Sequence, residues 1–420
     1  MDRMSKSHEN FIMTISTIVL GIVAGTGSLL LGAFLDLIES LFLNFNETAT
    51  HPFAGLISPA HRMLSLVTGG LVAAVVWWLM RTRMKPAVGI SKALDGQEMP
   101  VTTTIVHVLT QIFFVATGGS VGRELAPREL GAMLAQTWQR LLKRFRHIEL
   151  SDDDRRLLIA SAAGAGFAGV YIAPITGAMF CLELLYKKVT GRAVAVSLTM
   201  SSIAMLVGSL LRGFHPYYAV GSGAFSATSV FVVLILGPLC GILGAYFRQA
   251  FQWANQHQTR DNHLLWQLPA VAVVTGLIAT TFPQIMGNGR ALAQPAFMNQ
   301  SVNLIWLFLI GGLAKAIVTV FSLRAGASGG TLTPSIAIGA TIGMALGFAI
   351  HLFVPAISIW QAGIIGAASL LASSQQAPLM ALFMLFEVCH LDHSALLPLG
   401  LGVALATTTS HVILNPSRSH

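Results

Sequence analysis

The chain has 420 residues, of which 54% are hydrophobic and only 10% are charged, and its mean hydropathy is +0.70. These values exclude an ordinary soluble domain and predict a polytopic membrane protein. The formal net charge of +8 comes with no nucleic-acid motif and no basic patch interleaved with aromatic residues, so we expect no nucleic acid partner.

Apolar runs follow one another along the chain, and several are long enough to span a bilayer. Others are short or interrupted by Gly and Pro, as in the broken helices of transport sites. The runs include Phe11–Leu35, Leu64–Met80, Val101–Val121, Leu157–Leu182, Ala193–Leu211, Phe225–Tyr246, Leu264–Phe282, Val302–Leu313, Thr333–Ile359 and Ala362–Phe386. Residues 1–10 are charged and polar without a cleavage pattern, which predicts a cytoplasmic N-terminal segment and no signal peptide.

Eleven of the 25 Lys and Arg residues gather in three loops between apolar runs, within 81–92, 140–146 and 187–192. The excess of Lys and Arg predicts that these loops face the cytoplasm. The three cysteines, Cys181, Cys240 and Cys389, lie in or beside apolar runs without metal-ligand spacing. They are expected to be buried thiols, with no disulfide and no metal site.

A glycine-rich polar break at residues 118–129 begins at the end of the apolar run Val101–Val121. It contains the acidic residue Glu124. An ionisable residue at membrane depth is costly and usually functional. A glycine run followed by a new apolar segment suits a helix N-terminus, where free N–H groups and the helix dipole attract anions.

The arrangement around this break occurs twice. Pro127 closes the glycine-rich part of the first break, and Pro334 closes a second glycine-rich break 207 residues later. Downstream, Pro174 and Pro378 lie 204 residues apart, each nine residues before a glutamate. The similar offsets predict two repeats, residues 11–212 and 213–414, followed by a short tail at 415–420 and no cytoplasmic domain.

Taken together, four segments resemble the CLC family of chloride channels and transporters. They are Gly-Arg-Glu at 122–124, Gly-Gly-Thr-Leu-Thr-Pro at 329–334, and the two Ala-Pro segments that start at Ala173 and Ala377 and end in glutamate. The resemblance covers roughly residues 12–410. It implies an all-α membrane fold of two inverted repeats, whose broken helices meet at a central anion site, and a homodimer with one anion pathway per subunit.

By the same resemblance, Glu124 is the external gating glutamate, which occupies an anion site when ionised and leaves it when protonated. Backbone N–H groups at the two breaks would hold the dehydrated anion. The expected anion-binding residues are Met84, Gly122, Arg123, Glu124, Leu125, Thr331, Leu332 and Thr333.

The sequence departs from the family pattern at four places. Pro127 stands three residues after Glu124 instead of two, and residues 83–90 contain no serine for the central anion, so Met84 or Val88 takes its place. Leu184 stands where chloride/proton exchangers carry an internal glutamate, and the tyrosine expected at 410–416 is missing. Loss of the serine and the internal glutamate resembles the bacterial branch that exports fluoride in exchange for protons.

Each of these residues also has a structural interpretation. Glu124 could pair with Arg123 or Arg128, and Arg123 is better explained as a brace for backbone carbonyls than as an ion ligand. Glu183 and Glu387, at equivalent repeat positions, are expected to brace helix ends. Other structural interpretations are a helix-end methionine for Met84, helix caps for Thr331 and Thr333, and a core histidine for His107.

No catalytic motif of a metalloprotease, serine hydrolase or nucleotide-binding enzyme is present, so we expect neither an enzyme nor a cofactor. The sequence predicts a multi-pass transporter of halide anions in a bacterial inner membrane, coupled to protons through Glu124, with fluoride favoured over chloride. A chloride/proton antiporter and a passive voltage-gated chloride channel stay open as alternatives.

Overall fold

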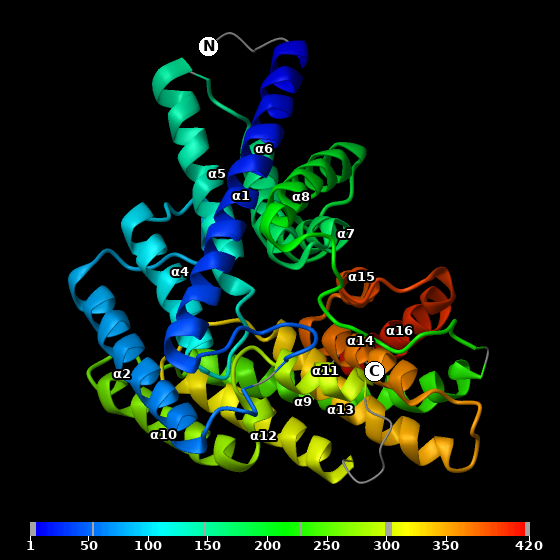
Figure 1. Ribbon diagram of the computed structural model, residues 1–420. Coiled ribbons are helices and arrows are strands. Elements are labelled where there is room, and N and C mark those ends of the chain that lie inside the picture. Colours follow the sequence, from blue (N-terminus) through cyan, green and yellow to red (C-terminus); the bar gives the residue numbers. More distant parts are fainter. Residues whose placement is uncertain (1–5, 53, 147, 227, 299–304, 416–420) are drawn as a thin grey trace. The chain divides into compact units, whose positions relative to one another are not determined.

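The computed structural model describes residues 6–52, 54–146, 148–226, 228–298 and 305–415. Helices dominate these ranges, and no strand occurs within them (Figure 1). Of the expected N-terminal segment 1–10, residues 1–5 lie outside the described residues and residues 6–10 form the start of the first helix. Of the expected tail 415–420, only residue 415 is described.

The helices of the first half are α1 (Lys6–Leu43), α2 (Pro59–Arg83), α3 (Ile90–Leu94), α4 (Val101–Ala116), α5 (Leu125–Arg146), α6 (Asp152–Tyr171), α7 (Pro174–Met179), the π-helix η1 (Phe180–Tyr186) and α8 (Gly191–Arg212). Those of the second half are α9 (Ser229–Gln256), α10 (Leu264–Thr281), η2 (Pro283–Ile285), α11 (Arg290–Met298), α12 (Ile305–Arg324), α13 (Leu332–His351), α14 (Ile359–Gln375), α15 (Pro378–Val388), η4 (His393–Ala395) and α16 (Leu396–Leu414).

Eight helices in the described ranges are long and apolar enough to cross a membrane, judged by length and composition. All but one of them match predicted apolar runs. The exception is the helix at 393–414, and α5 was not among the predicted runs either. In α5 the charged residues Arg128 and Glu129 lie near the start and a basic cluster lies at the end, so hydropathy alone does not reveal it.

The chain divides into two compact units. The first comprises Met1–Ala33, Met80–Leu109 and Glu124–His215. Within it, α6 packs against both α5 and α8 (Figure 1). Glycine permits this packing, because a side chain at Gly131 would collide with the Ala162 carbonyl on the neighbouring helix.

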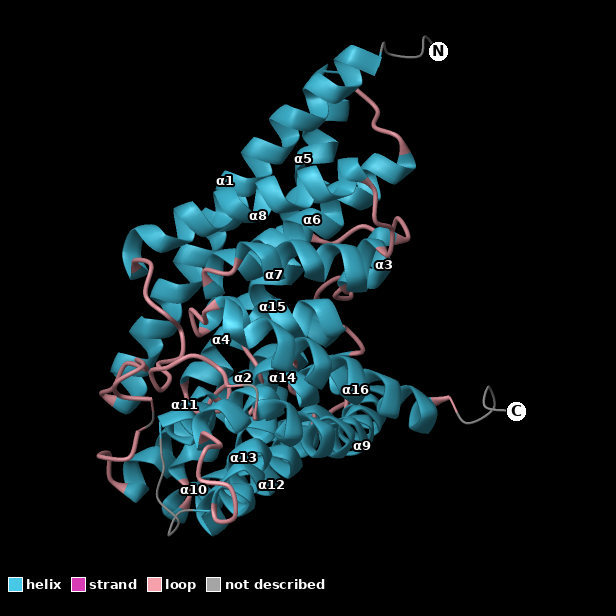
Figure 2. Ribbon diagram, turned by 90° about the vertical axis from the view of Figure 1, so that its right-hand side faces the viewer, coloured by secondary structure: helices cyan, strands magenta, loops and turns pink. Residues whose placement is uncertain are grey.

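The second unit comprises Phe34–Leu79, Thr110–Arg123 and Pro216–His420. Its centre is formed by α13 and α14, which pack with α9 and α16 (Figure 2). Here too glycines allow close contact, since a side chain at Gly339 would collide with the carbonyl of Gly366.

The predicted repeat is present in the local backbone. α6 ends in the left-handed residue Ile172 (φ 55°) and α14 ends in the left-handed residue Gln376 (φ 56°). Each is followed two residues later by the proline that begins the next helix, Pro174 or Pro378. Proline lacks an N–H and clashes with the preceding turn, so it ends one helix and suits the first position of another.

The glycine-rich breaks also match each other. Gly118 (φ 107°) and Gly326 (φ 112°) both lie in the left-handed region that favours glycine. The N–H of the next residue, Gly119 or Ala327, donates to a carbonyl five residues earlier in both breaks. The second-half segment thus repeats the turn that ends the helix before the first break.

Candidate functional site

Two backbone hydrogen bonds join the glycine-rich breaks within the second unit. The N–H of Gly122 donates to the Gly330 carbonyl over 2.7 Å, and the N–H of Gly330 donates to the Gly122 carbonyl over 2.7 Å. A side chain at Gly329 would lie 2.5 Å from Val121 Cγ2, which shows how closely the segments approach. This bridge brings together two stretches that lie far apart in the sequence.

Each break leads directly into a long helix. α5 begins at Leu125, immediately after Glu124, and α13 begins at Leu332, immediately after Thr331. The first N–H groups of a helix have no acceptor within the helix, and the helix dipole adds partial positive charge there. Both breaks therefore have the passage into a helix N-terminus that the sequence pattern predicts.

Glu124 is fully buried, at 0% exposure, at the start of α5. Its main-chain carbonyl accepts a hydrogen bond from Arg128 Nε over 2.8 Å. The Arg128 guanidinium also lies 4.8 Å from the centre of the Phe180 ring in the same unit. Arg128 thus contacts Glu124 through the main chain, one turn into the helix that follows the break.

The second break presents a hydroxyl at its helix start. Thr331 occupies the N-cap position of α13, but its side chain makes no capping hydrogen bond. Its Oγ1 instead accepts a hydrogen bond from Gln375 Nε2 over 3.1 Å. Thr333 and Leu332 are buried in the first turn. Thr331 therefore occupies the predicted N-cap position, but its hydroxyl does not cap the helix.

Met84 lies in the first unit, just after α2. Its N–H donates to the Met80 carbonyl over 3.1 Å, and its side chain is half-buried. Val88, the other candidate to replace the missing serine, packs against the core cluster of the first unit. Of the predicted site residues, Gly122 is therefore joined to the second break, which leads to Thr331. The contact described for Met84 is with another residue of the first unit.

Arg123 is buried, with its guanidinium 5.3 Å from the centre of the Tyr217 ring. The same ring lies 4.1 Å from the guanidinium of Arg290. Sequence reasoning did not identify Tyr217 or Arg290, because both are far from the breaks in sequence and belong to no motif. The interpretation of Arg123 as a brace for backbone carbonyls stays a prediction, since the contact found is with an aromatic ring.

A buried lysine lies beside the first break and was also missed. Lys315, on α12, has 0% exposure, and its Nζ donates to Ser120 Oγ over 2.8 Å. It also donates to the carbonyls of Ile285 and Gly287 over 3.1 and 2.6 Å. The sequence did carry a signal, since Lys315 is a charged residue just beyond the predicted run Val302–Leu313 and is followed by further apolar residues. Charged residues within membrane helices are usually functional.

The remaining titratable residues predicted to be structural are arranged in different ways. His107 Nε2 lies 3.7 Å from Glu129 Oε2, and both side chains are largely buried, at 10% and 9% exposure. This contact agrees with the interpretation of His107 as a core histidine. Glu183 lies in η1 and Glu387 near the end of α15, and both are half-buried.

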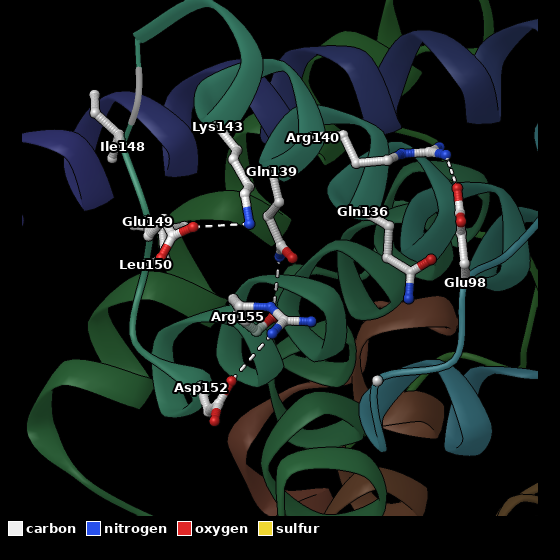
Figure 3. A pocket seen from close by; sticks show the side chains of 11 residues that line it. Glu98, Gln136, Gln139, Arg140, Lys143, Ile148, Glu149, Leu150, Asp152 and Arg155 are labelled. Carbon is white, nitrogen blue, oxygen red and sulfur yellow. Dashed lines mark hydrogen bonds and ion pairs between the residues drawn. The ribbon is translucent and has the colours of Figure 1, made fainter.

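A cavity of about 400 Å³ opens in the first unit among charged side chains (Figure 3). Three ion pairs cross or border it: Arg140 with Glu98, Lys143 with Glu149, and Arg155 with Asp152. Each basic side chain of this cavity faces an acidic one, so its charge is already balanced. It is therefore a poorer candidate for an anion site than the breaks.

Comparison with known proteins decides the family. The model of the voltage gated chloride channel family matches residues 69–411, which is most of the chain. The chain belongs to this family, the CLC family. The resemblance stated from the two breaks and the Ala-Pro segments is thus confirmed, and the chain is a CLC-type anion transporter in the broad sense that includes channels.

Several CLC relatives are similar over nearly their whole length. The voltage-gated ClC-type chloride channel ClcB of Salmonella dublin is 28% identical over 392 residues, which cover 90% of this chain and 90% of that protein. The putative chloride channel protein ClcB-like of Ralstonia nicotianae is 28% identical over 369 residues, covering 85% and 84% of the two chains.

Solved CLC structures share the fold. A slow cyanobacterial Cl⁻/H⁺ antiporter matches with a TM-score of 0.80 at 19% identity, covering 96% of this chain and 94% of that one. A CLC-type fluoride/proton antiporter matches with a TM-score of 0.69 at 21% identity, covering 97% of each chain. The predicted fold class, an all-α polytopic membrane protein of two inverted repeats with broken helices, is confirmed.

Proposed function

We propose that this CLC protein is a proton-coupled halide antiporter in which Glu124 is both the gate and the proton carrier. The observation that carries the proposal is the burial of the Glu124 carboxyl group one residue after Arg123 and two residues after the Gly122–Gly330 bridge. Burying a charge is costly, so an ionisable residue kept at this depth usually has a function. A carboxylate in this position competes with an anion for the helix N-terminus and yields that position when it takes up a proton.

The proposed anion ligands are the N–H groups at the start of α5 and of α13, around Gly122, Arg123, Leu125, Leu332 and Thr333. Partial positive charges of this kind stabilise a dehydrated anion without the strong hold of a fixed full charge. Met84 is proposed to replace the serine of the usual chloride transporters. Its thioether offers no proton to an anion, so it shapes the path instead.

Fluoride is the proposed substrate ahead of chloride. It is small and strongly hydrated, so its dehydration requires compact donors. Thr331 is one such donor, because its hydroxyl accepts a bond from Gln375 and, among the described residues, its own proton has no acceptor. The missing central serine supports the same assignment.

A chloride/proton antiporter or a passive chloride channel is the second candidate. It is favoured by the names of the ClcB relatives, which are called voltage-gated chloride channels. By analogy with the family, we also propose a homodimer with one pathway per subunit, in a bacterial inner membrane. The 81–92, 140–146 and 187–192 loops face the cytoplasm in this arrangement.

The first test follows anion efflux and proton movement together in liposomes that contain the purified protein and either fluoride or chloride. For the wild type we expect faster fluoride than chloride efflux, with protons driven uphill. Glu124→Gln keeps the shape of the side chain but cannot ionise, so coupling is lost. Glu98→Gln is the control, because Glu98 is an exposed partner of Arg140, and its flux matches the wild type.

Two outcomes contradict the proposal. Chloride efflux without proton movement would identify a passive channel and remove the proton role of Glu124. Equal coupling for chloride with no preference for fluoride would retain the antiporter and the role of Glu124, while the fluoride assignment fails.

A further inference from the structure

The second unit contains a buried cluster of charged residues around one aromatic ring. The Tyr217 ring lies 4.1 Å from the guanidinium carbon of Arg290 and 5.3 Å from that of Arg123. Arg290 Nη2 also donates to the Tyr217 carbonyl. Aromatic rings attract guanidinium groups, so the ring holds two positive charges that would otherwise repel each other. We call Arg123, Tyr217 and Arg290 the arginine stack.

Two carboxyl groups face the arginine stack. Glu47 Oε1 accepts a hydrogen bond from the Tyr217 hydroxyl over 3.3 Å and lies 3.5 Å from Arg290 Nη1. Glu39 Oε2 accepts the N–H of Glu47 over 2.9 Å. Burial raises the pKa of Tyr217 to about 12, so its hydroxyl stays protonated and donates. The two carboxyl groups are therefore connected to the stack and to each other.

Among the described residues, the half-buried Asp36, one turn before Glu39 on α1, acts on Glu39 more weakly than Glu47 and Arg123 do. Arg123 acts on Glu39 as well, so both arginines of the stack are coupled to the acidic pair. Asp36 is partly exposed to solvent and is left out of the buried group, in which the carboxylates of ionised Glu39 and Glu47 balance the two guanidinium groups. When one of them is protonated, the stack and the pair together carry one net positive charge.

One hydrogen-bond donor of Arg290 has no acceptor among the residues that the structure describes. Arg290 is only 7% exposed, and its Nε is fully buried without a hydrogen-bond partner among the described residues. The remaining guanidinium nitrogens do have partners, in Tyr217 and Glu47. Buried charged donors are rarely left unsatisfied, so an unpaired one indicates a missing ligand. An acceptor with negative charge and no proton, such as a halide, meets that requirement.

The cluster lies close in sequence to the gate, since Arg123 directly precedes Glu124. Glu47 lies in the loop between α1 and α2, whereas the basic segment 81–92 follows the other end of α2. A helix of this length spans a bilayer. In the proposed orientation, the cluster is therefore on the external side.

We propose that the arginine stack is an outer halide-binding site, which takes up a halide together with a proton that binds the Glu39–Glu47 pair. The halide accepts the Arg290 Nε–H and restores the charge balance that protonation removes. The external direction of uptake rests on the proposed function, but halide binding at the stack does not depend on Glu124.

The test counts halide ions bound per subunit, by calorimetric titration of sodium fluoride and sodium chloride into purified Glu124→Gln protein at acidic and neutral pH. This background removes the gate carboxylate from the titration. We expect one more halide per subunit at acidic than at neutral pH. Adding Glu47→Gln makes one carboxyl permanently neutral, so the higher count is expected at both pH values.

Adding Arg290→Lys instead removes the Nε donor and the planar fork, and the lower count is expected at both pH values. Arg324→Lys is the matched control, because Arg324 is an arginine of the same unit that donates to Thr259, and it keeps the pattern of the parent. The gain of binding in Glu47→Gln cannot arise from misfolding. A parent whose count is the same at both pH values, or an Arg290→Lys protein that binds like the parent, overturns the inference.

The two proposals can fail separately. If Glu124→Gln abolishes proton coupling in liposomes but the number of bound halide ions is the same at both pH values, the antiporter proposal is supported and the outer-site proposal is wrong. If coupling never occurs but the count follows pH as expected, the outer site stands in a protein that is a channel.

Discussion

Lys315 places a buried ammonium group beside the first glycine-rich break, with three oxygen atoms within hydrogen-bond distance. The lysine holds Ser120, two residues before Gly122, against the 285–287 segment. It therefore fixes the position of the break and adds a positive charge next to it. Both effects support the proposed anion position at the start of the helices that follow.

Lys315→Met removes the donor to Ser120 Oγ and to the Gly287 carbonyl, while the Ile285 carbonyl still accepts a hydrogen bond from Ser120 Oγ. We expect a loss of unfolding free energy of about 3 kcal/mol, since each unsatisfied buried group costs about 1–3 kcal/mol. Lys143→Met is the control, because Lys143 forms an exposed pair with Glu149 that is worth under about 1 kcal/mol. Thermal unfolding in detergent measures both. Equal losses would mean that Lys315 has no structural role at the break.

At the scale of single residues, the sequence predicts well those features that are formed by residues close together in the chain. The break around Glu124 and the start of α13 at Leu332 could be predicted, because glycine, proline and an ionisable residue stand together in a few positions. The contacts of Tyr217 and Arg290 could not, because partners from distant segments are chosen by the tertiary packing and leave no local pattern.

The positions of helices α13 and α14 depend on glycine residues that have no functional side chain. Their glycines allow the two backbones to approach, and a side chain at Gly366 would collide with the Gly339 carbonyl. Membrane helices lack a strong hydrophobic drive to associate, so this close packing matters for their stability. α13 begins at the second break, so its packing also positions that break.

Gly366→Ala and Gly363→Ala make a matched pair on α14. The first places a methyl group against backbone, whereas the second meets its nearest atom, Phe297 Cδ1, at 3.5 Å. We expect Gly366→Ala to reduce stability by about 2 kcal/mol, within the range of overpacking, and Gly363→Ala to change it little. Thermal unfolding and halide flux measure the difference. Similar behaviour of the two variants would show that the helices can separate without loss.

At the scale of single helices, hydropathy predicted two long apolar runs, and proline explains why each of them forms two helices. The runs Leu157–Leu182 and Ala362–Phe386 each read as one apolar stretch, but each is cut where Pro174 or Pro378 begins a new helix. The sequence indicates such a break, whereas it does not indicate the π-helix that continues α7 as η1. That difference between the repeats depends on packing within the first unit.

The basic loops predict how the protein is oriented in the membrane. The 81–92 and 187–192 segments are rich in Lys and Arg, while the α1–α2 loop that carries Glu47 is not. Positive loops stay on the cytoplasmic side during insertion. The external position of the arginine stack and the direction of the gate both depend on this assignment.

Single cysteines at exposed loop positions test the orientation. We expect Thr50→Cys, in the α1–α2 loop, to react with a membrane-impermeant maleimide on intact cells. Lys85→Cys, in the basic loop, should react only after the cells are permeabilised. The three native cysteines are buried and serve as the unlabelled background. The reverse pattern would place the basic loops outside and invert the proposed direction of uptake.

The double hydrogen bond between Gly122 and Gly330 also limits how this protein can move. Two bonds that run in opposite directions between the same two residues cannot slide by one position without both breaking, so the two breaks move as one rigid joint. Large helix displacements are thereby disfavoured at this point, and the fast rotation of side chains is left as the available motion. In the proposed antiporter, turnover is then set by how quickly Glu124 changes its rotamer and its protonation state, and not by a large movement of the helices.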